Sequence, residues 1–109
     1  MKTLPYDKAK MEQIIKKYPT PFHIYDEAGI ISAAHNLQRA FQWNVGYKEY
    51  YAVKACPNPA ILKLLHRNGC GMDCSSETEL MLCEKLGITG EDIMFSSNQT
   101  PVEDMKKAY

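Results

Sequence analysis

The sequence predicts an α/β fold built on a parallel sheet with right-handed crossovers. Three short β-type runs alternate with segments of helical periodicity, and each connection between them takes only a few residues. Strands that alternate with helices in this way lie parallel, because each helix returns the chain to the same end of the sheet. Capping residues at the expected helix starts support this order.

The amino-terminal part is predicted to form a helix followed by a short strand. Apolar residues recur at helical spacing over Met11–Tyr18, and the two prolines that follow end this helix. Residues Phe22–Tyr25 alternate like a strand. The next helix is predicted over Ile30–Phe41, where one apolar stripe recurs, and it should end before Gly46.

The first strand–helix unit begins with a strand predicted over Glu49–Val53. Its helix is expected to start at Asn58, because asparagine caps helices and Pro59 suits the first turn. The helix should end at Asn68-Gly69, and its expected buried face consists of Ile61, Leu64 and Leu65.

The second and third units carry capping-box signals. The second strand is predicted over Gly71–Cys74, and Ser76–Glu79 opens a helix that ends at Gly87. The third strand is predicted over Ile93–Phe95. Thr100–Glu103 then reads as another capping box, at the start of a last helix.

Composition and charge favour a small molecule or a protein as the partner. Thirteen Lys and Arg residues balance thirteen Asp and Glu residues, so no basic field predicts binding to nucleic acid or to a membrane surface. No apolar run approaches the roughly 20 residues of a membrane helix. The first seven residues also lack the apolar stretch of a signal peptide. A cytoplasmic protein is therefore expected.

The cysteines and histidines are expected to be structural. The four cysteines should be reduced thiols, because nothing in the sequence indicates export. Cys70 and Cys74, with His66 nearby, lack the second ligand pair of a zinc site, so no metal is expected. The histidines have no carboxylate or cysteine at catalytic spacing.

Lys54 is the strongest candidate for a catalytic residue. It stands where the apolar run Tyr50–Val53 ends, and the strand ends of α/β folds are where binding and chemistry collect. In an alternating strand Ala52 shares the face of Lys54, and its small side chain leaves room for a planar group. Ala52 is therefore a candidate for cofactor binding.

Polar residues also follow the other two strands. Asp73 with Ser75, and Ser97 with Asn98, should join Lys54 at the carboxyl ends of parallel strands. An amine in partly apolar surroundings there could form a Schiff base with an aldehyde, as the lysine of pyridoxal phosphate enzymes does. The residues alone leave open the alternative that Lys54 is a solubilising surface residue and that the serines only cap helices.

Four motifs occur in order along the chain: Pro21-Phe22-His23-Ile24-Tyr25-Asp26, Tyr51-Ala52-Val53-Lys54-Ala55, Gly69-x-Gly71-x-Asp73-x-Ser75-Ser76-x-Thr78-Glu79-Leu80 and Ile93-x-Phe95-Ser96-Ser97-Asn98. Together they resemble the amino-terminal part of fold-type III pyridoxal phosphate decarboxylases, and among these the diaminopimelate decarboxylases most closely. The resemblance runs through nearly the whole chain from about Pro21.

The resemblance implies a (β/α)8 barrel of the alanine racemase type, a separate β domain and a homodimer with shared active sites. It also implies decarboxylation of meso-diaminopimelate to L-lysine in lysine biosynthesis. Lys54 matches the lysine that forms the Schiff base with pyridoxal phosphate, and Asp73 matches an acidic residue beside the cofactor. Phe22–Tyr25 matches a segment that pairs with the β domain.

A barrel of this kind takes roughly 250 residues, so the 109 residues of this chain hold only its first three βα units. We therefore expect a single amino-terminal fragment, with a helix and strand in residues 1–26 and the first barrel units in 27–109. Such a fragment should be inactive alone, and its third strand should leave an open sheet edge.

The substrate stays open at this level. The stretch Asp73–Glu79 is also similar to ornithine and arginine decarboxylases, and Cys56 stands where the family more often has asparagine or another small polar residue. A non-catalytic α/β module that keeps the framework is the alternative from a different class.

Overall fold

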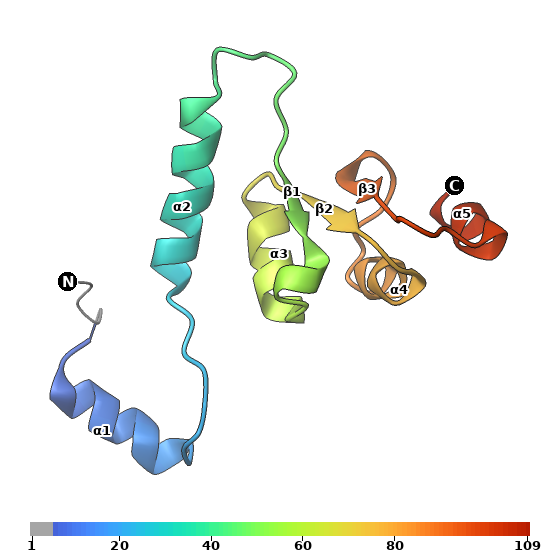
Figure 1. The fold of residues 1–109 in the computed structure, drawn as a ribbon. Coiled ribbons are helices and arrows are strands. Elements are labelled where there is room, and N and C mark those ends of the chain that lie inside the picture. The colour runs from blue at the N-terminus through green and yellow to red at the C-terminus, as the bar shows by residue number, and fades with distance from the viewer. Residues whose placement is uncertain (1–5) are drawn as a thin grey trace.

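The computed structural model describes residues 6–109 and contains a three-stranded sheet (Figure 1). The strands are β1 (Tyr50–Ala52), β2 (Gly71–Cys74) and β3 (Ile93–Phe95), in the order β1-β2-β3. Both neighbouring pairs are parallel, as the alternation of strands and helices predicted. The second and third strands have the predicted bounds, whereas β1 is shorter than expected.

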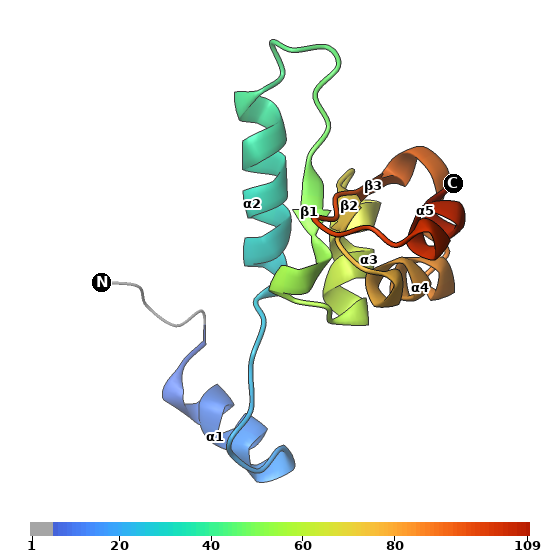
Figure 2. The same cartoon turned by 45° about the vertical axis from the view of Figure 1, so that its right-hand side comes forward.

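Helices cover one face of the sheet. Helix α3 (Pro59–Arg67) and helix α4 (Glu77–Lys85) both contact β2, α2 (Glu27–Ala40) packs against α3, and α5 (Val102–Ala108) packs against α4 (Figures 1 and 2). Met72 and Cys74 are completely buried, whereas Asp73 between them is only half-buried. Because side chains alternate along a strand, Asp73 belongs to the face that these helices leave uncovered.

The core lies between the covered face of the sheet and the helices. The buried residues, which come from the turn after β1, from β2, from α2, α3 and α4 and from the loops between them, are Ala34, Val53, Leu62, Leu65, Cys70, Met72, Cys74, Leu80, Cys83 and Ile88. The predicted buried face of α3 is partly wrong, because Leu62 is completely buried while Ile61 and Leu64 are half-buried. Leu62 belongs to this core, and Ile61 packs against the core from a half-buried position.

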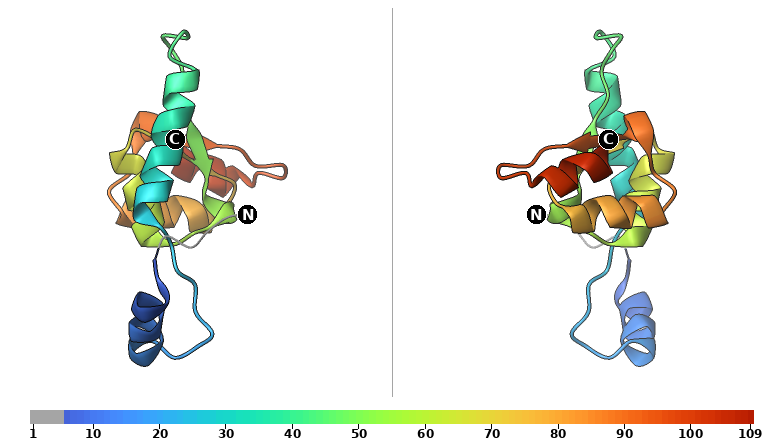
Figure 3. Two further views of the ribbon diagram at one scale, coloured as in Figure 1. Left: turned by 90° about the vertical axis from the view of Figure 1, so that its left-hand side faces the viewer. Right: turned by 90° about the vertical axis from the view of Figure 1, so that its right-hand side faces the viewer.

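Helix α1 (Lys8–Lys17) lies apart from the sheet (Figure 3). Its cap is Asp7, whose Oδ1 accepts a hydrogen bond from the Lys10 N–H at 2.8 Å. The predicted strand at Phe22–Tyr25 is wrong, because this segment is irregular. A strand requires a hydrogen-bonded neighbour, and the sheet of residues 6–109 contains only β1, β2 and β3.

Two of the three predicted caps form. Asn58 Oδ1 accepts from the Ala60 N–H at 2.9 Å, and the side chain of Ser76 accepts from the Glu79 N–H. The predicted capping box at Thr100–Glu103 is wrong: the Thr100 hydroxyl donates to the Ser97 carbonyl, and α5 begins at Val102 without a side-chain cap. Pro101 therefore holds the cap position instead of Thr100, and proline has no side-chain acceptor for a backbone N–H.

Gly71 lets the ring of Tyr50 lie over the sheet. A Cβ at Gly71 would lie 2.5 Å from Tyr50 Cδ1 and 3.0 Å from the Asp92 carbonyl oxygen. The ring has little freedom to move away, because the Tyr50 hydroxyl donates to the Glu91 carbonyl at 2.8 Å. The close approach of the Tyr50 ring to the backbone therefore requires a residue without a Cβ at position 71.

We expect Gly71→Ala to lower the free energy of unfolding by about 1–3 kcal/mol, since an overpacked contact forces neighbouring atoms to shift. Urea denaturation followed by circular dichroism measures this loss. Gly46→Ala is the matched control: a Cβ there meets only Asn44 Oδ1, at 3.9 Å. The control should stay within about 0.5 kcal/mol of the wild type. Equal losses in the two variants would contradict the role of Gly71.

A charged cluster joins the start of β1, the end of α3 and the turn before β3. Lys48 Nζ lies 2.5 Å from Asp92 Oδ1, and His66 Nε2 lies 2.8 Å from Asp92 Oδ2. The hydrogen bonds from His66 and Lys48 lower the pKa of Asp92, and the hydrogen bond to Asp92 raises the pKa of Lys48. His66 thus has a structural partner, as expected for a histidine outside the catalytic site.

Acid should weaken this cluster. A carboxylate whose folded-state pKa is lowered stabilises the fold above its unfolded-state pKa of about 3.9, and the stabilisation is lost as the pH falls through the folded-state value. The Asp92 side chain is 41% exposed, so solvent screening limits the effect to about 1 kcal/mol or less. Urea unfolding between about pH 2 and pH 6 should show a larger loss for wild type than for Asp92→Asn. Parallel pH profiles would contradict this account.

Candidate functional site

Lys54 lies immediately beyond the end of β1. The strand stops at Ala52, and Val53–Ala55 form one turn of 3-10 helix before the cap of α3. Val53 is completely buried and anchors the turn, while Lys54 is exposed. Among residues 6–109 the Lys54 amine has no hydrogen bond or ion pair. The chain therefore presents an accessible amine on an anchored turn.

Two expectations about Lys54 need correction. The predicted strand continued to Val53 and placed Ala52 and Lys54 on one face by alternation, but the strand ends at Ala52. The turn, and not strand alternation, sets the direction of the Lys54 side chain. Partly apolar surroundings were also expected, whereas Lys54 is exposed, since the turn carries it past the last paired residue of β1.

Ala52 and Asp73 form a row across the sheet. In the parallel register Ala52 is the partner of Asp73, and Asp73 is the partner of Met94. Partners in register point to the same face, so all three side chains belong to the uncovered face of the sheet. Lys54 follows two residues after Ala52. The structure thus places Asp73 on the strand next to β1, which leads into the turn with Lys54.

Ser96 contacts Asp73, whereas the sequence analysis expected Ser97 and Asn98 at this end of the sheet. The Ser96 hydroxyl donates to Asp73 Oδ1, whereas the Ser97 carbonyl accepts from Thr100. Among the described residues, neither Ser97 nor Asn98 forms a hydrogen bond with Asp73. Ser96 follows Met94 by two positions and therefore keeps its face, so strand alternation could have identified Ser96.

The amino-terminal segment reaches the turn that carries Lys54. The Tyr25 hydroxyl lies 3.5 Å from Cys56 Sγ, two residues after the lysine. This hydrogen bond with Cys56 raises the pKa of the Tyr25 phenol. Although Phe22–Tyr25 is not a strand, its last residue is in contact with the candidate site.

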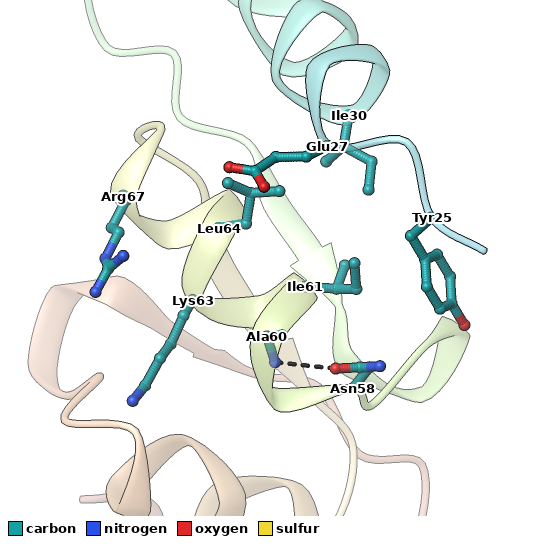
Figure 4. A pocket seen from close by; sticks show the side chains of 9 residues that line it. All are labelled: Tyr25, Glu27, Ile30, Asn58, Ala60, Ile61, Lys63, Leu64 and Arg67. Carbon is teal, nitrogen blue, oxygen red and sulfur yellow. Dashed lines mark hydrogen bonds between the residues drawn. The ribbon is translucent and has the colours of Figure 1, made fainter. Parts of the chain in front are cut away.

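A groove of about 510 Å³ lies between the first turn of α2 and helix α3 (Figure 4). Ile30 of α2 lies above Ile61 and Leu64 of α3, and Tyr25 lies beside Ile61. Lys54, Ala52 and Asp73 do not line this groove. The groove is therefore separate from the candidate site.

The buried cysteines do not compete with Lys54 as nucleophiles. Cys74 and Cys83 lie with their sulfur atoms 3.6 Å apart, and both are free thiols, as is Cys70. Burial raises the pKa of all three thiols. The thiolate is the reactive form of cysteine, so these residues are inert near neutral pH.

Residues 27–109 match the family model described as the pyridoxal binding domain of pyridoxal-dependent decarboxylases. The chain belongs to this family. Its relatives include Protein TabA of Pseudomonas amygdali pv. tabaci, 48% identical over 98 residues that cover 90% of this chain and 23% of the relative. Diaminopimelate decarboxylase of Thermoplasma acidophilum is 35% identical over 98 residues, covering 90% of this chain and 24% of the relative.

Solved decarboxylase structures share the fold of this chain. Diaminopimelate decarboxylase from Helicobacter pylori, complexed with L-lysine, superposes with a TM-score of 0.78 at 34% identity, over 90% of this chain and 25% of that one. Ornithine decarboxylase from Entamoeba histolytica superposes with a TM-score of 0.80 at 29% identity. The match covers 93% of this chain and 32% of that one. These matches confirm the predicted partial barrel.

The family also confirms the expected cofactor, pyridoxal phosphate. The residues present fit this group: an accessible amine at a strand end, a small neighbouring side chain on the same strand, and a carboxylate on the next strand.

The chain spans about a quarter of the length of the curated relatives it matches. Among the helices of residues 6–109, none has the length and apolarity needed to cross a bilayer.

Proposed function

We propose that Lys54 is the residue through which an amino-acid decarboxylase holds pyridoxal phosphate, with Ala52 and Asp73 beside the cofactor. The observation that carries the proposal is the Lys54 amine, exposed and without a partner among residues 6–109, at the end of β1. The match of the Tyr51–Ala55 motif to the family's lysine motif and the pyridoxal-binding description of residues 27–109 support it.

Each residue has a separate task in this proposal. Lys54 supplies the amine that attaches the cofactor, and buried Val53 anchors the turn that presents this amine. Ala52 leaves space beside the attached ring, and Asp73 supplies a negative charge from β2. Pyridoxal phosphate, when bound, supplies an electron sink for the electron pair that carbon dioxide leaves behind.

For the substrate we propose meso-diaminopimelate, which would give L-lysine and carbon dioxide. Two relatives more than 30% identical to this chain, from Thermoplasma acidophilum and Helicobacter pylori, are named diaminopimelate decarboxylase. Ornithine is the competing substrate, since an ornithine decarboxylase superposes equally well at lower identity. Carbon dioxide release by the whole protein from diaminopimelate, ornithine and arginine separates these possibilities.

The wider arrangement belongs to the same proposal. Residues 1–26 and 27–109 would form the amino-terminal part of a barrel that carries the cofactor, in a cytoplasmic homodimer of lysine biosynthesis. The alternative is a non-catalytic α/β module that shares the strand–helix framework. The match of the Tyr51–Ala55 motif to the family's lysine motif and the pyridoxal-binding description of residues 27–109 favour the enzyme.

Titration with pyridoxal phosphate tests the proposed site. The whole protein should take up one equivalent, with visible absorbance that survives dialysis, and Lys54→Ala should lose this retained absorbance. Lys63→Ala is the control, because Lys63 is also an exposed lysine but belongs to α3. Equal retention by Lys54→Ala and wild type would overturn the assignment of Lys54. A wild-type protein that retains no cofactor would favour the module.

A further inference from the structure

Ser96 is tied to β2 at two consecutive residues. Its backbone N–H donates to the Cys74 carbonyl at 2.9 Å, and its hydroxyl donates to Asp73 Oδ1. The first bond fixes the backbone of Ser96 beside the end of β2, next to a completely buried residue. The backbone that carries the Ser96 hydroxyl is therefore fixed relative to β2.

The same contact leaves half of the Asp73 carboxylate available. Oδ1 accepts from Ser96, while Oδ2 has no partner among residues 6–109, and no described lysine or arginine pairs with this carboxylate. An ionised carboxylate can accept several hydrogen bonds, so Oδ2 keeps its capacity for another donor. Fixing one oxygen also removes rotamer freedom that a ligand would otherwise have to restrict on binding.

We propose that Ser96 is a positioning residue, whose hydroxyl holds Asp73 so that its second carboxylate oxygen stays directed to the group bound at Lys54. This inference rests on the proposed function of Lys54 and Asp73, and Ser96 acts only through Asp73. The register supports it, because Ala52, Asp73 and Met94 form one row and Ser96 lies two residues beyond Met94.

The test compares four proteins by their dissociation constants for pyridoxal phosphate, read from visible absorbance. Ser96→Ala should bind about threefold to tenfold more weakly, because cofactor binding must then restrict the rotamers of an Asp73 side chain that Ser96 no longer holds. Ser96→Thr, which keeps the hydroxyl, should restore wild-type binding. Ser32→Ala is the control, since Ser32 is an exposed serine of α2, and it should bind like wild type.

A second comparison separates positioning from a general structural effect. In an Asp73→Ala background, Ser96→Ala should cause no further loss of cofactor affinity, since its only route of action is gone. The free energy of unfolding of Ser96→Ala should stay within about 0.5 kcal/mol of wild type, because Ser96 is exposed.

Several results would overturn the inference. They are unchanged cofactor affinity in Ser96→Ala, an undiminished Ser96 effect without Asp73, and failure of Ser96→Thr to restore binding. In each of these cases the assignment of Lys54 still stands, provided that wild type retains the cofactor and Lys54→Ala does not. Retention by Lys54→Ala would instead overturn the proposed function, and the inference about Ser96 with it.

Discussion

Replacing Lys54 by alanine is expected to reduce decarboxylation by about a thousandfold or more, because the variant lacks the amine that attaches the cofactor. No other described lysine can replace it without rearrangement, since Lys54 alone occupies the turn between β1 and α3. Release of labelled carbon dioxide by the whole protein measures the loss. Lys63→Ala, the exposed lysine of α3, should keep the wild-type rate.

The variant Lys54→Arg tests whether the reaction needs the nucleophilic amine of Lys54 or only its positive charge. Arginine keeps a cation at this exposed position, but its guanidinium does not deprotonate near neutral pH and so cannot act as the nucleophile. The variant should therefore be as inactive as Lys54→Ala. Activity within about tenfold of wild type in either variant would contradict the proposed role of Lys54.

The largest expected effect on stability comes from Leu62. This side chain of α3 is completely buried in the core. Leu62→Ala should lower the free energy of unfolding by about 2–5 kcal/mol, through lost burial and the cavity that remains. Domains typically have only about 5–15 kcal/mol of stability, so the midpoint of thermal unfolding should fall markedly.

Leu64→Ala is the matched control for Leu62→Ala. Both changes are leucine to alanine in α3, so they alter helix propensity equally, but Leu64 is only half-buried and faces the groove beside α2. The control should lose less than half as much stability. If the two variants unfolded at the same urea concentration, the core would not be centred where the structure places it.

The sequence predicted most of the strand–helix framework, because the signals for it are local. The starts of α3 and α4 were predictable from Asn58 and Ser76, whose side chains bind backbone N–H groups within three residues. The strands β2 and β3 were predictable from apolar runs bounded by turn residues. Their parallel pairing then followed from the alternation with helices.

The predictions were wrong where the structure of a segment depends on residues that are distant in the sequence. Phe22–Tyr25 alternates like a strand, yet in residues 6–109 no strand lies beside it to complete a ladder. Thr100 has the spacing of a helix cap, but α5 begins at Val102, so Pro101 holds the cap position. The face of α3 that is buried depends on both the sheet and α2, which the apolar stripe alone could not specify.

The candidate site was predictable in part. Lys54, Ala52 and Asp73 were identified from strand ends and from family resemblance, and the register brings the last two into one row. Ser96 was missed, although its spacing from Met94 placed it on the same face as Asp73. The turn at Val53–Ala55 could not be predicted, since an apolar run gives no signal for the residue at which a strand becomes a 3-10 turn.

The most direct test of the central claim is to locate the lysine that carries the cofactor. The whole protein is loaded with pyridoxal phosphate, reduced with borohydride to make the bond permanent, digested and mapped by mass spectrometry. We predict one pyridoxyl group per chain, on Lys54, and none on exposed Lys63. A stoichiometric label on any other lysine, or no label in a protein that decarboxylates its substrate, would contradict the account.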